Sequence, residues 1–170
     1  SKKSHFKNSV QKNIEKIVSL FNDIGVKLVI HTGDITNPRS LRKFTELNCE
    51  FIGVLGNNDR NEPDLLETAT EISIRLESPP LELSKFKRNI AVFHEPDQIN
   101  NFLKENKNID IVLHGHTHRY RNEIFKGTLL FNPGESAGIF TGKNAIGIID
   151  LKDLSIETVS YTHLTLPTTE

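Results

Sequence analysis

Three short apolar segments that each end in a glycine and polar side chains constrain this chain most strongly. The segments and their endings are Val26–Thr32 with Gly33-Asp34, Phe51–Leu55 with Gly56–Asp59, and Ile109–Val112 with Leu113–His118. Apolar segments of this length bounded by glycine indicate buried strands. Because potential ligands follow each strand at the same end, we expect a functional site along one edge of a sheet.

The whole chain has the properties of one soluble domain. It has 170 residues, with 21 Lys plus Arg against 22 Asp plus Glu, so strong nonspecific nucleic-acid binding is not expected. The single cysteine, Cys49, cannot form an internal disulfide and fits a reducing compartment, so we expect a cytoplasmic location. The apolar runs are too short to span a bilayer and show no signal-peptide pattern, so we expect no membrane partner.

The two ends differ from the rest of the chain. The sequence contains no Met, so Ser1 is not expected to be a translated start. Residues 159–168 resemble the translation of a sequencing adapter, and we expect residues 159–170 to be a non-native tail. A native polar tail is the alternative. The expected domain therefore covers residues 1–158.

Hydrophobic periodicity predicts alternating helices and strands, followed by a meander of strands. The expected helices are Val10–Ile24, Pro38–Leu47, Pro63–Thr70 and Asp97–Glu105. The expected strands are Leu28–Ile30, Cys49–Leu55, Ile72–Leu76, Leu81–Phe86, Asn89–Phe93, Ile109–Leu113, Glu123–Phe125, Thr128–Phe131, Ala145–Leu151 and Ser155–Thr158. Alternation favours parallel strands and a meander favours antiparallel ones. The pattern predicts an α/β (α+β) fold of two stacked mixed sheets with helices outside.

The polar endings supply a set of metal ligands. The candidates are Asp34, Asn57, His94, His116 and His118. Mixed oxygen and imidazole ligands suit Mn, Fe, Zn, Co or Ni better than Ca or Mg. One carboxylate can bridge two cations, and two cations about 3.5–4 Å apart can hold a phosphoryl group and activate a water.

Each candidate also has a purely structural interpretation. Asp34 could cap a helix, Asn57 and Asn58 could be turn residues, and His94 could be a hydrogen-bonded strand-end histidine. Their joint occurrence in this order argues against independent structural roles. Two further histidines are interpreted structurally: His31 as packed or on the surface, and His114 as a half-buried residue at a strand end.

These motifs resemble those of the calcineurin-like metallophosphoesterase superfamily, and more closely its small prokaryotic single-domain phosphodiesterases. The matching motifs are Gly33-Asp34, Gly56-Asn57-Asn58-Asp59, the lone His94, Gly115-His116-Thr117-His118 and Asn132-Pro133-Gly134-Glu135. The resemblance runs from about Val10 to Thr158. It implies a four-layer α/β/β/α sandwich of two mixed sheets flanked by helices.

The resemblance also implies roles for individual residues. Asp34 would bridge two metals, Asn57, His94 and His116 would complete one site, and His118 would serve the other. Asp59 would orient the loop from outside the ligand set, and Asn132-Pro133-Gly134 would support the rim. Asn57, Asn58 and His118 would act in catalysis. The implied cofactors are two divalent transition-metal ions, with Mn²⁺ first and Ni²⁺, Fe, Co²⁺ or Zn²⁺ as alternatives.

The sequence departs from the family pattern in three places. The family's first strand ends in Asp-x-His, whereas this chain has Lys3-Ser4-His5, so we expect the sequence to lack that strand and to be a poor or inactive catalyst. Many relatives have a titratable His where this chain has Asn58, which favours diesters with good leaving groups. Glu95 follows His94 in place of glycine and could add to the site or narrow it.

The leading hypothesis is a metal-dependent phosphodiesterase that acts on a small-molecule phosphoester by attack of a metal-bound hydroxide. The alternative is a catalytically weak or inactive protein-binding scaffold, as in one eukaryotic retromer subunit with this fold. The retained histidines His94, His116 and His118 favour the enzyme. A nuclease is disfavoured because no long basic strip accompanies the motifs. The sequence does not define the oligomeric state.

Overall fold

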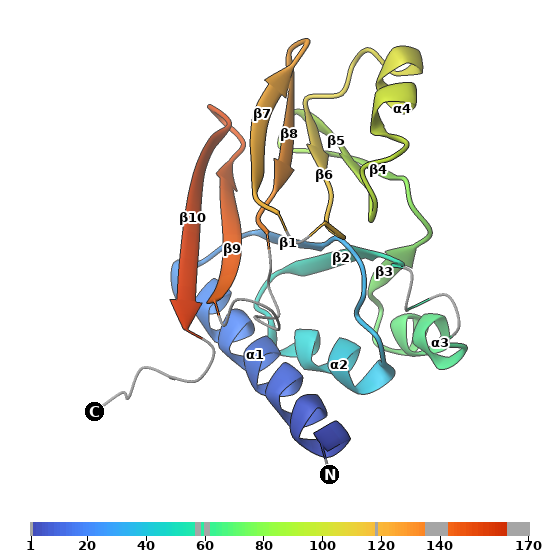
Figure 1. Cartoon of the computed structure of the whole chain (residues 1–170), viewed down its shortest axis with the longest axis vertical. Helices are drawn as coiled ribbons and strands as arrows, with labels where there is room; N and C mark the ends of the chain where they lie inside the picture. The colour runs from blue at the N-terminus through green and yellow to red at the C-terminus, as the bar shows by residue number, and fades with distance from the viewer. Residues whose placement is uncertain (1, 57–58, 60–61, 118, 135–142, 163–170) are drawn as a thin grey trace.

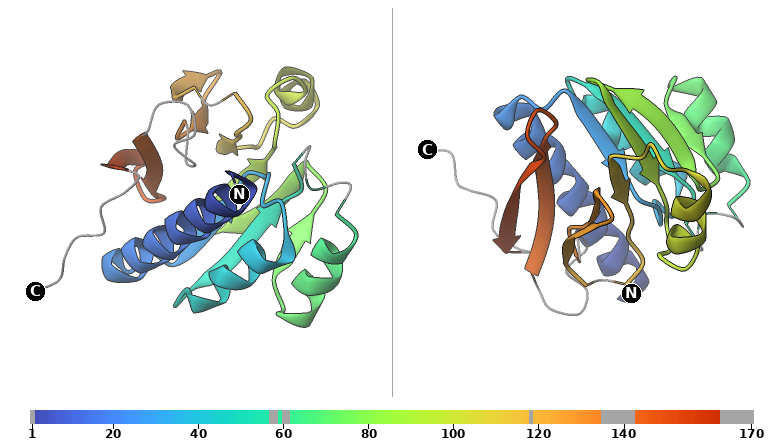
Figure 2. Two further views of the ribbon diagram at one scale, coloured as in Figure 1. Left: turned by 60° about the horizontal axis from the view of Figure 1, so that its bottom comes forward. Right: turned by 90° about the horizontal axis from the view of Figure 1, so that it is seen from above.

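The computed structural model describes residues 2–56, 59, 62–117, 119–134 and 143–162 (Figure 1). Helices α1, α2 and α3 lie on one side of a small sheet, and a larger sheet with helix α4 lies on the other side (Figures 1 and 2). This is the four-layer arrangement that the resemblance implied. None of the helices in the described ranges is long and apolar enough to cross a membrane.

The smaller sheet consists of three parallel strands in the order β1-β2-β3. These are β1 (Leu28–His31), β2 (Glu50–Val54) and β3 (Arg75–Glu77). One helix precedes each strand along the chain. The helices are α1 (Lys2–Ile24), α2 (Pro38–Lys43) and α3 (Asp64–Glu71), and a short 3₁₀ helix (Phe44–Glu46) follows α2. Phe51 of β2 packs toward the helices, whereas its neighbour Ile52 packs toward the second sheet. This alternation follows from the two-residue period of a strand.

The larger sheet is mixed and has the strand order β4-β5-β6-β8-β7. Its strands are β4 (Leu81–Lys85), β5 (Arg88–Val92), β6 (Ile111–Leu113), β7 (Arg121–Phe125) and β8 (Thr128–Asn132). The parallel neighbours are β5, β6 and β8, while β4 and β7 pair antiparallel at the two edges. Helix α4 (Ile99–Glu105) covers the outer face, where Ile99 packs against Ala91 and Val112.

Strands β9 (Lys143–Asp150) and β10 (Ser155–Thr162) form a separate antiparallel hairpin. Ile149 and Ile156 of this hairpin pack against the apolar cluster between the two sheets. Gly147 lies against the ring of Phe131, where a Cβ atom would overlap the ring. The hairpin extends past Thr158 into the segment that we expect to be non-native, and that expectation stays a prediction.

Several predicted boundaries differ from the observed ones, and two of the differences have a local explanation. Helix α1 begins at Lys2, eight residues before Val10, because backbone helix formation does not require the apolar spacing that marked its start. The predicted strand Ile72–Leu76 begins only at Arg75. Ile72 instead caps α3 through its N–H, and Ser73 has a φ of 59° that ends the helix.

Candidate metal centre

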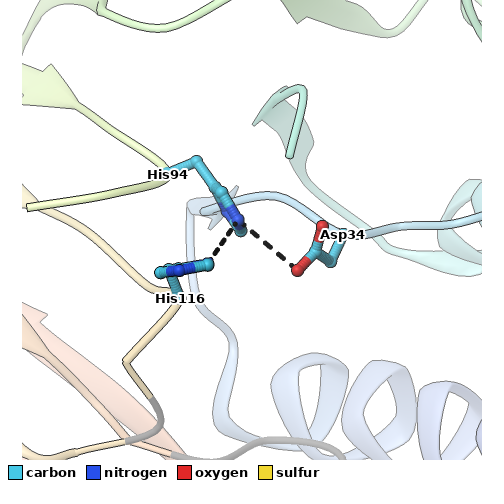
Figure 3. A group of neighbouring side chains, drawn as sticks. All are labelled: Asp34, His94 and His116. Atoms are coloured by element: carbon cyan, nitrogen blue, oxygen red, sulfur yellow. Dashed lines mark hydrogen bonds and ion pairs between the residues drawn. The ribbon is translucent and has the colours of Figure 1, made fainter. Parts of the chain in front are cut away.

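The polar residues that follow the predicted strands lie close together where parallel strands of both sheets end. Asp34 follows β1, Asp59 follows β2, His94 follows β5 and His116 follows β6. The carboxyl ends of parallel strands are the usual place for a ligand site in α/β proteins. Here two different sheets contribute, so the centre lies between the layers. Asp34, His94 and His116 form its core (Figure 3).

One potential ligand atom from each of these three side chains lies within 4.8 Å of the other two. His94 stands between the others (Figure 3): its Nε2 is 3.4 Å from Oδ2 of Asp34 and 3.3 Å from Nδ1 of His116. The His94 side chain is 3% exposed and that of Asp34 is 32% exposed. The group is therefore anchored in the interior and open to solvent on one side.

The tautomer of His94 follows from its other ring nitrogen. Nδ1 lies 2.8 Å from the carbonyl oxygen of Thr32, and a carbonyl only accepts, so Nδ1 carries the proton. In the neutral ring this leaves Nε2 as a lone-pair donor that faces Asp34 and His116. Metal-binding histidines are usually oriented by such a bond from the second nitrogen. Thr32 was not among the residues predicted from sequence, because its contribution is a backbone carbonyl.

The donor types, and the two donor spacings around His94, suit a transition-metal ion. Donors around a tetrahedral ion at bond lengths of about 2.0–2.1 Å lie about 3.4 Å apart, and the two spacings around His94 Nε2 are 3.4 and 3.3 Å. A carboxylate with two imidazoles is also the mixed donor set that such ions prefer. Glu95, which follows His94, is half-buried and does not belong to this group.

Asp59 holds the Asp34 loop in place. The Oδ2 atom of Asp59 accepts N–H bonds from Asp34 at 2.8 Å, Ile35 at 3.2 Å and Gly56 at 2.8 Å. Its Oδ1 accepts from Thr36 at 2.6 Å. The side chain is 2% exposed. Buried backbone donors need partners, so one carboxylate fixes the segments after β1 and β2 together.

These bonds matter because the loop backbone is strained. Asp34 has a φ of 64° and Thr36 a φ of 76°. Both values lie in the left-handed region of backbone conformation, which residues other than glycine rarely adopt. Gly56 is required for a different reason, since a Cβ there would overlap both the carboxylate and the N–H of Asp34. Gly33 likewise lies against the ring of His94. The two glycines permit the close approach of the three segments.

A second set of contacts supports the His116 turn, where the φ of His116 is 69°. Nδ2 of Asn132 donates to Oγ1 of Thr117 at 3.1 Å and to the Gly115 carbonyl at 3.4 Å. Its Oδ1 accepts from the N–H of Gly134 at 3.0 Å. Asn132 is 1% exposed. The contacts agree with a supporting role for the Asn132-Pro133-Gly134 turn.

The two histidines that were interpreted structurally are packed. His31 accepts an N–H bond from Gly33 at 3.0 Å and contacts the rings of Phe44 and Phe51. Desolvation lowers the pKa of His31 to about 4 despite the nearby carboxylates of Asp59 and Asp34. His114 is 2% exposed, more buried than expected, and this burial lowers its pKa. Three predicted catalytic residues, Asn57, Asn58 and His118, lie outside the described residues, as does Glu135.

Comparison with known proteins identifies the family. The family model for the calcineurin-like phosphoesterase superfamily domain matches residues 4–154. The chain belongs to this superfamily. A phosphodiesterase of Methanocaldococcus jannaschii is 34% identical over 141 residues, which cover 81% of this chain and 84% of that protein.

Solved structures agree with the superfamily fold. A structure described as a novel archaeal phosphodiesterase superposes with a TM-score of 0.80 at 29% identity, over 88% of this chain and 92% of that one. A phosphoesterase from E. coli gives a TM-score of 0.59 at 19% identity, over 87% and 91% of the two chains. Vacuolar protein sorting 29 of Entamoeba histolytica gives 0.56 at 16% identity, over 81% and 83%. The last two likenesses concern the fold alone.

Superfamily membership confirms the class predicted from the motifs. The calcineurin-like chain is a phosphoesterase-type hydrolase, and the group of Asp34, His94 and His116 is its candidate site for divalent metal. The coarse function and the family thus followed from the sequence motifs alone.

Proposed function

We propose that this calcineurin-like protein is a phosphodiesterase that uses two divalent transition-metal ions, with Mn²⁺ the first candidate. The observation that carries the proposal is the convergence of Asp34, His94 and His116 within 4.8 Å inside a calcineurin-like domain. The relative from Methanocaldococcus jannaschii, which bears the name phosphodiesterase, supports the choice of diesters. A small-molecule phosphoester substrate and a cytoplasmic location are parts of the same proposal.

Asp34 would bridge the ions, with His94, His116 and Asn57 holding one and His118 contributing to the other. When bound, the ions would supply an activated water for in-line attack and neutralise charge on the phosphoryl oxygens. The protein's own contribution is to hold the donors in place beforehand. Asp59 holds the Asp34 backbone, Thr32 orients His94, and Asn132 holds the turn of His116.

Asn58 is proposed to face the leaving group without titrating. An amide can donate a hydrogen bond but cannot transfer a proton at neutral pH, so leaving groups that need protonation would react slowly. Loss of a general acid typically costs about 10²–10⁴-fold in rate. The expected substrates are therefore diesters whose leaving group is a good one, such as a nitrophenolate.

The test compares hydrolysis of bis(p-nitrophenyl) phosphate with that of p-nitrophenyl phosphate, each with Mn²⁺, with Ni²⁺ and with EDTA. Because the sequence has no Asp-x-His motif, the assay is run on this chain and on a version with such a strand added before Ser1. Metal-dependent diester turnover is expected, at least in the extended version. His116→Ala and Asp34→Asn should each reduce it at least about a hundredfold.

Asp64→Asn is the matched control, since this carboxylate is exposed in the first turn of α3 and is not in the metal group. It should leave turnover unchanged. Near-wild-type turnover of His116→Ala with excess Mn²⁺ would overturn the proposal. A folded, metal-binding chain that hydrolyses neither ester in either version would support the scaffold alternative.

A further inference from the structure

Strand β7 forms one edge of the five-stranded sheet, with β8 as its neighbour on one side (Figure 1). No other strand of the described ranges pairs with it. Four of its five residues are exposed, which distinguishes it from the fully buried β8. An exposed edge presents unpaired backbone groups that can accept a further strand.

Apolar side chains accompany this open edge. Ile124 is 66% exposed, and Tyr120, just before the strand, is 54% exposed. The pairs Ile124 with Leu129 and Asn122 with Phe131 place these residues on the face that packs between the two sheets. The ring of Tyr120 also contacts that of Phe131. Tyr120 and Ile124 therefore continue the apolar inner face of the sheet to its β7 edge. In a monomer these two side chains are exposed to water.

The hydrogen bonds between β8 and β6 determine which N–H and C=O groups of β7 point to the open edge. Leu129 donates its N–H to Asp110, and the carbonyl of Phe131 accepts from His114, so Leu129 and Phe131 face β6. The intervening residues of β8 face β7, and their partners there include Arg121 and Glu123. Antiparallel pairs alternate in this way. Asn122 and Ile124, and Tyr120 by the same alternation, consequently turn their N–H and C=O groups to the open edge.

We propose that two copies of this chain associate by antiparallel pairing of their β7 strands about a two-fold axis beside Asn122. In this register Asn122 lies opposite the partner's Asn122, and Tyr120 lies opposite the partner's Ile124. Arg121 lies opposite the partner's Glu123, twice by symmetry. Aromatic–β-branched and opposite-charge pairs are favourable across strands, so both faces of the joined sheet are complementary.

Charge selects this register over its neighbours. A shift of the axis by one residue toward the C-terminus would place Glu123 opposite the partner's Glu123. A shift toward the N-terminus would place Arg121 opposite the partner's Arg121. Like charges directly opposite each other are destabilising. An axis between two residues would set outward-facing groups against inward-facing ones, which forms no ladder of hydrogen bonds.

The association is tested by analytical ultracentrifugation of the full chain across a range of concentrations. A short edge-to-edge interface is small, so we expect a reversible dimer with a dissociation constant in the range of about 1–100 µM. Glu123→Arg and Arg121→Glu should each weaken dimerisation at least about tenfold, because each places two pairs of like charges opposite each other. The double exchange Arg121→Glu with Glu123→Arg restores both pairs and should restore the dimer.

Asn122→Lys brings two ammonium groups together at the axis and should also weaken the dimer. Its matched control is Ser84→Lys, a change at an exposed position of β4 on the other edge of the same sheet, which should have no effect. Thermal melts establish that each variant is folded. A monomer at all concentrations up to about 1 mM would overturn the proposal. The proposal would also be overturned if neither Glu123→Arg nor Arg121→Glu weakened the dimer, or if the double variant did not restore it.

Discussion

The carboxylate of Asp59 accepts the backbone N–H of Asp34 at 2.8 Å across 25 positions of sequence. The same oxygen accepts from Gly56, and the other oxygen from Thr36, so a single side chain connects two loops of the candidate metal centre. None of these contacts needs a bound ion. Hydrogen bonds within the protein therefore hold the backbone of the Asp34 loop.

Asp59→Asn tests this dependence. The amide nitrogen cannot accept a hydrogen bond, so at least one of the four N–H groups loses its acceptor and faces a donor instead, at about 1–3 kcal/mol. We expect a destabilisation of about 2 kcal/mol or more, measured by urea unfolding. Mn²⁺ affinity, measured by calorimetry, should fall about 10–100-fold, as for other residues that orient ligands. Asp64→Asn is the control. Unchanged affinity would show that the loop holds its shape without Asp59.

Gly56→Ala tests the close approach of the loops. A Cβ at this position would overlap the carboxylate of Asp34, so the methyl group must displace a proposed ligand. We expect at least about a tenfold loss of Mn²⁺ affinity from the displaced ligand. The matched control is Gly25→Ala, where a Cβ meets no atom within 4 Å but the φ of 78° is unfavourable. That variant should lose about 1 kcal/mol of stability and keep its affinity for Mn²⁺.

Metal removal should change the thermal stability of the chain. An ion that binds only the folded protein stabilises it by about 2.7 kcal/mol at a free concentration 100 times the dissociation constant. We expect Mn²⁺ to raise the melting temperature and EDTA to reverse the rise. In His116→Ala, Mn²⁺ should no longer raise the melting temperature, because one of the three convergent donors is lost. An equal increment in the variant would place the bound ion elsewhere.

The lowered pKa of His31 predicts acid sensitivity. In the unfolded chain this imidazole takes up its proton near pH 6.5, whereas burial holds its pKa at about 4 in the folded protein. The unfolded state thus binds more protons between these values, so stability falls as the pH drops from about 6.5 to about 4. His114, whose pKa is also lowered by burial, acts in the same direction.

His31→Asn isolates this contribution. The side-chain oxygen of Asn can take the place of Nδ1 as the acceptor for Gly33, but it does not titrate. In EDTA, the free energy of unfolding of the variant should vary less with pH between 4 and 6.5 than that of the wild type. Identical pH profiles would mean that His31 is protonated equally in both states.

The sequence predicted the elements that carry strong periodicity and the residues that end them. Asp34, His94 and His116 lie together where parallel strands end, but these strands belong to two sheets and not to the single sheet edge that the pattern predicted. Contacts made by backbone atoms were not predictable in this way. The carbonyl of Thr32 that orients His94 carries no side-chain signature.

The conformation of Ile72 and the burial of His114 could not be predicted from the sequence pattern either. Ile72 fitted the alternation of a strand, yet its N–H bonds to Thr68 and Thr70 extend the end of α3. His114 looked like a half-buried residue, but it is enclosed and lies 3.3 Å from the guanidinium of Arg121. In both cases a specific local contact, which hydrophobic periodicity does not encode, determined the outcome.

The proposed ligands of the centre come from different layers of the sandwich, with Asp34 after β1 of one sheet and His94 and His116 after β5 and β6 of the other. A cation bound to all three would act as a cross-link between the layers. Its presence should make the two sheets open together, so that amide hydrogens of β1 and β5 exchange at a common, slower rate. In this fold, occupancy of the centre would also determine how independently the two halves of the molecule move.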